Sequence, residues 1–192
     1  MYKLFKSIKF FFINISNLLN ICLLKTKPEN LVYSKFLLTT LLAINAFIHY
    51  QGNLIGVKFL NKINHKFLNI YPANLSQTLS IIAVIFFGSG LFIYFCLFIV
   101  KKQNRFVQLF SSIMIIDLVF RLGLVLVMFM HTYYVSLSLI IMILLMYWQL
   151  IVLNFVFANG FDFGYLKSII LVFIYMFFKY NLNMGFIKYF LL

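Results

Sequence analysis

The sequence predicts an all-α protein, a polytopic transmembrane helix bundle of about five spans with amphipathic interfacial helices. Of its 192 residues, 65% are hydrophobic and 10% are charged. A soluble domain has about 25% charged residues, so this composition excludes that class. Four apolar stretches are long enough to cross the roughly 30 Å hydrocarbon core of a bilayer as helices. Lys and Arg residues flank these stretches, as is typical of membrane-spanning helices.

The pattern of residues 1–30 predicts an amphipathic basic segment that lies on the membrane surface. Lys3, Lys6 and Lys9 recur every three residues, and aromatic and aliphatic residues gather on another face. A basic face opposite an apolar one suits the plane of the membrane interface. Pro28 ends this segment. The first residues also have the basic-then-apolar order of a signal peptide, but no small-residue cleavage site follows, so we expect them to be retained.

The integral membrane domain is predicted at residues 31–192, with spans at about 31–50, 77–100, 106–130, 135–158 and 165–180. The first span is the weakest, because residues 36–50 give only 15 residues without a charge, and a re-entrant or interfacial segment is the alternative. Residues 51–76 predict a second surface helix, with lysines at four-residue spacing and an end at Pro72. We expect the residues after Tyr180 to return to the interface.

Short connections and small residues predict how the spans are joined. The connection at residues 131–134 is short enough to make its two neighbouring spans an antiparallel hairpin. Residues 159–164, NGFDFG, predict a turn because they combine two glycines with an Asp. The Gly88-Ser89-Gly90 sequence allows a neighbouring helix to approach closely, or allows the helix to bend.

The net charge of +13 arises from 16 Lys and Arg residues against three acidic residues. The basic residues are dispersed along the flanks of apolar segments, so the expected partners are the lipid bilayer and its anionic lipid headgroups, not nucleic acid. Placing residues 101–105 in the cytoplasm puts ten basic residues inside and five outside. We therefore expect a cytoplasmic amino terminus and a bacterial inner membrane, with the mitochondrial inner membrane as the alternative.

Asp117 and Arg121 are the only charges expected deep inside the membrane, because Lys35, Lys167 and Lys179 lie near the ends of their predicted spans. They lie four residues apart and share a helix face, which predicts an ion pair within one helix. Burying either charge alone costs at least about 2.5–3.5 kcal/mol, which pairing partly offsets. We favour a structural role over a proton or ion path, because no other buried acid or base is expected. Gln149 and Asn154 of the next span are the expected hydrogen-bonding partners.

No motif predicts catalysis or metal binding. Cys22 and Cys96 are far apart in apolar surroundings, so we interpret them as small core residues. His49, His65 and His131 fall at predicted span ends or in loops, where we expect them to be solvated at the interface. There is no phosphate loop, nucleophile elbow or HExxH motif. The sequence therefore predicts no enzyme, no cofactor and no catalytic or metal-binding residue.

Two stretches of the chain resemble a known family. Residues 23–48 contain a basic-Pro-acidic turn, a Ser and a hydrophobic segment, and residues 147–175 contain a Trp, polar and small residues, a turn and a final span. Both stretches resemble a family of small, uncharacterised proteobacterial inner-membrane proteins that is often described as Yip1-like. They cover just over a quarter of the chain. Val32 replaces an expected Pro, and Asn154 lies where a Gly or His region is usual. The resemblance implies a polytopic bundle without known catalytic residues.

Three roles remain open. We favour a non-enzymatic scaffold or accessory factor, because each intramembrane polar group can be assigned a structural partner. The first alternative is a transporter or channel subunit in which Asp117, Arg121, Gln149 and Asn154 line a polar cavity; a water-filled path to Asp117 would favour it. The second is a small organelle-encoded subunit of a respiratory or translocation complex, which fits the abundance of Phe. The protein partner expected for these roles is a second copy of the chain, in a homo-oligomer, or another subunit of a larger membrane complex.

Overall fold

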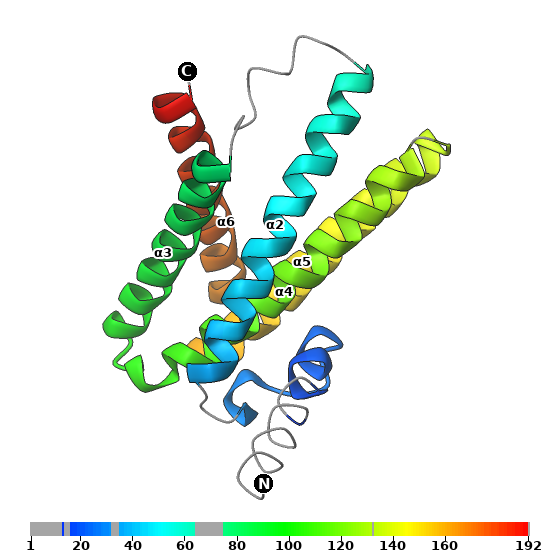
Figure 1. The fold of residues 1–192 in the computed structure, drawn as a ribbon. Coiled ribbons are helices and arrows are strands. Elements are labelled where there is room, and N and C mark those ends of the chain that lie inside the picture. Colours follow the sequence, from blue (N-terminus) through cyan, green and yellow to red (C-terminus); the bar gives the residue numbers. More distant parts are fainter. Residues whose placement is uncertain (1–12, 14–15, 32–34, 64–74, 132, 192) are drawn as a thin grey trace, which may run out of the picture.

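The computed structural model describes residues 13, 16–31, 35–63, 75–131 and 133–191. Five long helices dominate these residues: α2 (Lys35–Ile63), α3 (Leu75–Ile99), α4 (Phe106–His131), α5 (Val135–Phe161) and α6 (Tyr165–Leu191). Two short 3₁₀ helices, η1 (Pro28–Asn30) and η3 (Gln103–Arg105), precede α2 and α4. No strand is present in these residues, so the predicted all-α class is confirmed. The long helices run alternately in opposite directions (Figure 1).

Among the described residues, four helical stretches are long and apolar enough to cross a membrane: Leu79–Ile99, Gln103–His131, Val135–Phe161 and Tyr165–Asn183. Large apolar side chains remain on their outer faces, where Phe87 and Phe177 are each 71% exposed. So much continuous apolar surface is unfavourable in contact with water but favourable in contact with lipid tails. The chain is an integral, multi-pass membrane protein.

Helix α2 lies beside α4 and completes a bundle of about five spans. Asn45 of α2 is fully buried, and its Nδ2 donates a 2.9 Å hydrogen bond to the carbonyl oxygen of Met114. Further along, Gly52 lies against the side chain of Val125. At the other end, Gln108 Nε2 donates to the carbonyl oxygen of Leu31, at 2.9 Å. The stretch of α4 between Met114 and Val125, which contacts α2 at Asn45 and Gly52, is roughly 16 Å long at about 1.5 Å per residue, so α2 follows α4 over about half of a bilayer's thickness.

Two helices extend beyond the predicted ends. Residues 51–63 continue α2 without a break, so the expectation that they begin a separate surface helix was wrong. Residues 64–74, the rest of that predicted helix, lie outside the described residues. Helix α6 likewise continues through the predicted tail to Leu191. Neither extension contains a proline, and lysines are good helix formers. The glycines at positions 52, 56 and 185 weaken these helices without ending them.

The described part of the amino-terminal segment packs against the bundle. Residues 16–22 are helical, and the side chains of Leu18 and Ile21 are fully buried. Trp148 of α5 donates a hydrogen bond from its Nε1 to the carbonyl oxygen of Cys22, at 3.3 Å. Burial raises the pKa of the Cys22 thiol to about 11, so this cysteine is an unreactive core residue, as predicted. Residues 1–12, which carry the predicted basic face, lie outside the described residues.

Ion pairs join three segments at the amino-terminal end of the bundle. The guanidinium of Arg105 contacts Asp162 in the α5–α6 turn (Nη1–Oδ1 3.0 Å) and Glu29 in η1 (Nη2–Oε2 3.5 Å). Lys102 also pairs with Asp162, and Lys27 pairs with Glu29 at 3.8 Å. The predicted turn at residues 159–164 is confirmed in part: α5 includes residues 159–161, and the turn follows at 162–164, with Asp162 in the left-handed conformation that ends α5 (φ 54°). These segments therefore lie at the same end of the bundle (Figure 1).

Glycines mark the closest approaches between helices. Gly88 of α3 lies directly against Leu182 of α6, so the close approach predicted for the Gly-Ser-Gly sequence is confirmed. Gly160 of α5 is in similar contact with Leu109 of α4. The α4–α5 hairpin predicted from the short connection is also confirmed by the helix bounds. Small residues allow such helices to approach each other closely within a membrane.

Candidate functional site

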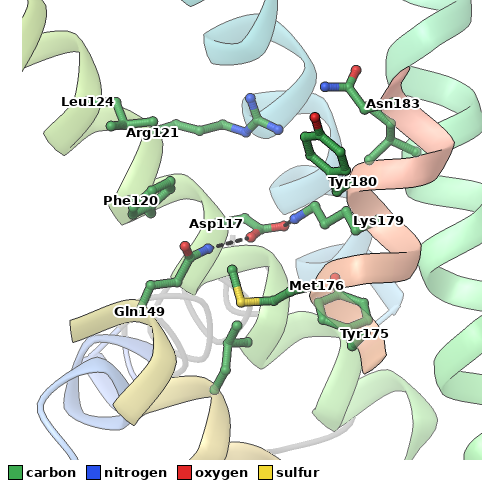
Figure 2. A pocket seen from close by; sticks show the side chains of 12 residues that line it. Asp117, Phe120, Arg121, Leu124, Gln149, Tyr175, Met176, Lys179, Tyr180 and Asn183 are labelled. Atoms are coloured by element: carbon green, nitrogen blue, oxygen red, sulfur yellow. Dashed lines mark hydrogen bonds and ion pairs between the residues drawn. The ribbon is translucent and has the colours of Figure 1, made fainter. Parts of the chain in front are cut away.

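Asp117 is the centre of a polar cluster between three helices. Its carboxylate lies near the middle of α4, and the residue is 2% exposed. One carboxylate oxygen, Oδ2, forms an ion pair with Nζ of Lys179 in α6. The other, Oδ1, accepts a hydrogen bond from Nε2 of Gln149 in α5, at 3.4 Å (Figure 2). The predicted contact between Gln149 and Asp117 is therefore confirmed, and a single carboxylate connects α4, α5 and α6.

Arg121 is not the ion-pair partner of Asp117. Within the part of the chain that the structure describes, its guanidinium forms no ion pair and no hydrogen bond, so the predicted intrahelical pair was wrong. The side chain extends from α4 toward Tyr180 and Asn183 of α6 (Figure 2). Both oxygens of Asp117 already have donors from other helices, which leaves Arg121 with only a longer-range attraction to the carboxylate.

Lys179 is the residue of this cluster that the sequence analysis missed. The last span was expected to end at Tyr180, which placed Lys179 on the outer surface. Because α6 continues to Leu191, Lys179 lies inside the helix, and its side chain is only 19% exposed. Its ammonium also lies 5.7 Å from the ring centroid of Tyr175. The expectation that no further buried base exists was therefore wrong; residues 180–183, YNLN, contain two asparagines and gave no clear signal that the helix continues.

Asn154 does not belong to the cluster. Its Oδ1 contacts the hydroxyl of Ser168 in α6. Ser168 also donates to the carbonyl oxygen of Tyr165 in the first turn of that helix, at 2.9 Å. Asn154 therefore joins α5 to the beginning of α6, and the expected bond to Asp117 or Arg121 is absent from the described residues.

A cavity of about 210 Å³ extends from Asp117 between α3, α4, α5 and α6. Its polar lining consists of Asp117, Arg121, Gln149, Lys179, Tyr180 and Asn183. Its apolar lining consists of Ile85, Phe120, Leu124, Leu153, Tyr175 and Met176. Water occupies about 30 Å³ per molecule in the liquid and enters cavities that offer polar partners. The cavity, which is mostly apolar but includes these polar groups, is therefore large enough for several water molecules or a small solute.

A second cavity of about 130 Å³ lies between α2 and α4, and Arg121 lines this one as well. His49 of α2 also lines it; the residue is 6% exposed, and its Nδ1 has no hydrogen-bond partner within the described residues. The expectation that His49 is solvated at the interface was therefore wrong, because α2 continues past Tyr50 beside α4. His131 lies at the end of α4, with its Nδ1 2.7 Å from the hydroxyl of Ser138. His65 lies outside the described residues.

No known protein helps to assign this site. Comparisons with protein-family models, with curated proteins and with solved structures find no match to the chain. The resemblance to the Yip1-like family therefore stays a prediction. Among the residues that the structure describes, no group of three or more His, Cys, Asp and Glu side chains is arranged to hold a metal ion. The arrangement around Asp117 is accordingly interpreted from its own chemistry.

Proposed function

We propose that the protein is a non-enzymatic transporter or channel subunit, and that the cavity beside Asp117 lies on the path of its solute. The observation that supports this proposal is a cavity of about 210 Å³, lined in part by charged side chains, that reaches a carboxylate in the interior of a membrane bundle. Charged side chains inside a membrane are costly and mark ion and substrate paths. Catalysis and a bound cofactor have no part in the proposed role.

The charges around the cavity favour this role over the scaffold that the sequence alone favours. The scaffold interpretation depends on every intramembrane polar group having a structural partner within the protein. Asp117 and Lys179 satisfy each other, but Arg121 adds a second cation to the cavity lining without an ion-pair partner in the described residues. A buried ion pair is weak support for stability, because apolar residues can stabilise the same packing at least as well. A role in binding explains why the charges and the space occur together.

The proposed location is a bacterial inner membrane with a cytoplasmic amino terminus. The ion pairs of Arg105 support the topology on which this orientation depends, because they hold η1, the segment before α4 and the α5–α6 turn at one end of the bundle. The orientation prediction places these three segments together on the basic side. Moving Lys179 from the outer surface into the bundle increases the difference in positive charge between the two sides.

Water access to the cavity tests the proposed function. In a variant without the native cysteines, we expect a membrane-impermeant thiol reagent to modify Met176→Cys, which lines the cavity. Phe173→Cys is the matched control, because Phe173 is 57% exposed on the outside of the same helix, where lipid covers it. In intact proteoliposomes, modification of Met176→Cys should be about tenfold faster, since a thiol must ionise in water to react.

Equally slow modification of the two cysteines would show that the cavity is dry. The transport role would then be wrong, and a packed scaffold would be the better interpretation. Modification of both cysteines at the same high rate would show that the reagent does not distinguish water from lipid at this depth. A neutral, lipid-soluble maleimide is the reference for intrinsic thiol reactivity, because it should modify both sites equally.

A further inference from the structure

The charge balance of the whole chain leaves Arg121 without a counter-ion. The sequence has only three acidic residues, Glu29, Asp117 and Asp162. Glu29 and Asp162 pair with basic residues at the amino-terminal end of the bundle, and Asp117 pairs with Lys179. Because this count covers every residue of the sequence, no further Asp or Glu side chain is available for Arg121. Within the chain, Arg121 has only the longer-range attraction of Asp117, whose carboxylate is already paired, so a second negative group beside Arg121 would come from outside the chain.

Arg121 lies deep in the membrane. It precedes the end of α4 at His131 by about three helical turns, or roughly 15 Å. Water screens a charge poorly at this depth, and an isolated guanidinium is unfavourable in the hydrocarbon region. The combined charge of Asp117, Lys179 and Arg121 is positive, so the cavity attracts anions.

Three other side chains that line the cavity with Arg121 can donate hydrogen bonds. Arg121 points toward the hydroxyl of Tyr180 and the amide of Asn183, and the ammonium of Lys179 lies beside them (Figure 2). All four side chains line the cavity of about 210 Å³. A guanidinium presents two parallel N–H groups that match two oxygens of a carboxylate or phosphate. The donors and the volume therefore fit a small oxyanion.

We propose that the cavity binds a small oxyanion, a carboxylate or phosphate group, at the guanidinium of Arg121. Lys179, Tyr180 and Asn183 supply further donors, while Asp117 limits the affinity by repelling the ligand. The inference rests on the proposed function for the idea that solutes enter this cavity, but binding can be measured without transport. A dissolved anion and the phosphate of an anionic lipid present the same chemistry, and the experiment separates these two sources.

The test measures the unfolding temperature of the full chain in uncharged detergent, followed by the fluorescence of its single tryptophan, Trp148. Sodium phosphate and sodium acetate are compared with sodium chloride at equal ionic strength. Saturating oxyanion should raise the unfolding temperature by about 4 °C, because a ligand that binds only the folded state stabilises it. Nanodiscs of phosphatidylglycerol and of phosphatidylcholine form the second arm. A rise with dissolved anions identifies a free solute, and a rise with phosphatidylglycerol alone identifies a lipid headgroup.

Variants assign the effect to the proposed site. Arg121→Gln should abolish the rise, whereas Lys167→Gln, which removes an exposed cation from the beginning of α6, should leave it unchanged. Asp117→Asn should lower the half-saturating anion concentration about tenfold, because it removes the repelling carboxylate. Arg121→Lys, which keeps the charge but loses the fork of donors, should weaken binding about tenfold and serves as the second variant if Arg121→Gln does not fold.

The proposal is overturned if neither oxyanion nor phosphatidylglycerol stabilises the wild-type protein. It is also overturned if Arg121→Gln keeps the full rise, or if Arg121→Lys binds as tightly as the wild type. These failures are distinct from a failure of the proposed function: fast modification of Met176→Cys together with absent anion binding would leave a water-filled cavity whose solute is not an oxyanion.

Discussion

Replacing Asp117 with Leu should lower the stability of the folded protein by about 3–5 kcal/mol, because it leaves a buried cation without its carboxylate. Asp117 and Lys179 have side chains that are only 3% and 19% exposed, so water cannot replace the lost partner. Asp117→Asn should have a smaller effect, since an amide oxygen still accepts hydrogen bonds from Lys179 and Gln149. The measurements are the yield of monodisperse protein in detergent and its thermal unfolding.

A double variant separates the ion pair from general damage to the core. Lys179→Met alone leaves Asp117 buried without its cation and should also be strongly destabilising, whereas Asp117→Leu combined with Lys179→Met removes both charges. We expect the double variant to recover most of the lost stability, because apolar residues of similar volume often replace a buried ion pair without loss. Wild-type yield and unfolding for both Asp117→Leu and Asp117→Asn would contradict the buried pair.

The fold was predictable because hydropathy alone determines the membrane spans. In α4 and α5, the predicted and observed ends agree closely, since turn residues follow each apolar stretch directly. In α2 and α6, lysines follow the apolar stretch instead. Lysines are compatible with both a continuing helix and a surface segment, so composition could not place these two ends.

The polar cluster was predicted in part. Helix periodicity determines which residues share a face of one helix, but not which residues of another helix they contact. Asp117 and Arg121 lie about 40° apart around α4, so their shared face was predictable. Gln149 and Asn154 are about 140° apart around α5, so only one of them can face Asp117, and the sequence already contained this information. The pairing of Asp117 with Lys179 depends on how α6 is placed against α4. No pattern within a single helix carries that information.

Replacing Gly160 with Ala should destabilise the bundle by about 1–3 kcal/mol, the usual effect of overfilling a packed core. A Cβ atom at this position would collide with the end of the Leu109 side chain, which is 1% exposed and is surrounded by other core residues. Leu109 therefore has little room to move, and α5 must shift away from α4. The change in unfolding temperature, read from tryptophan fluorescence, measures the effect.

Gly164→Ala is the matched control, because no atom lies within 4 Å of a Cβ at that position and its backbone does not require glycine. Its stability should change by less than about 0.5 kcal/mol. Gly88→Ala should fall between the two: its new methyl group meets Leu182, which is only partly buried and can turn toward lipid. If Gly160→Ala unfolds at the same temperature as Gly164→Ala, then α4 and α5 are not packed as closely as Gly160 and Leu109 indicate. The position of Gln149 beside Asp117, which depends on this same hairpin, would then be in question as well.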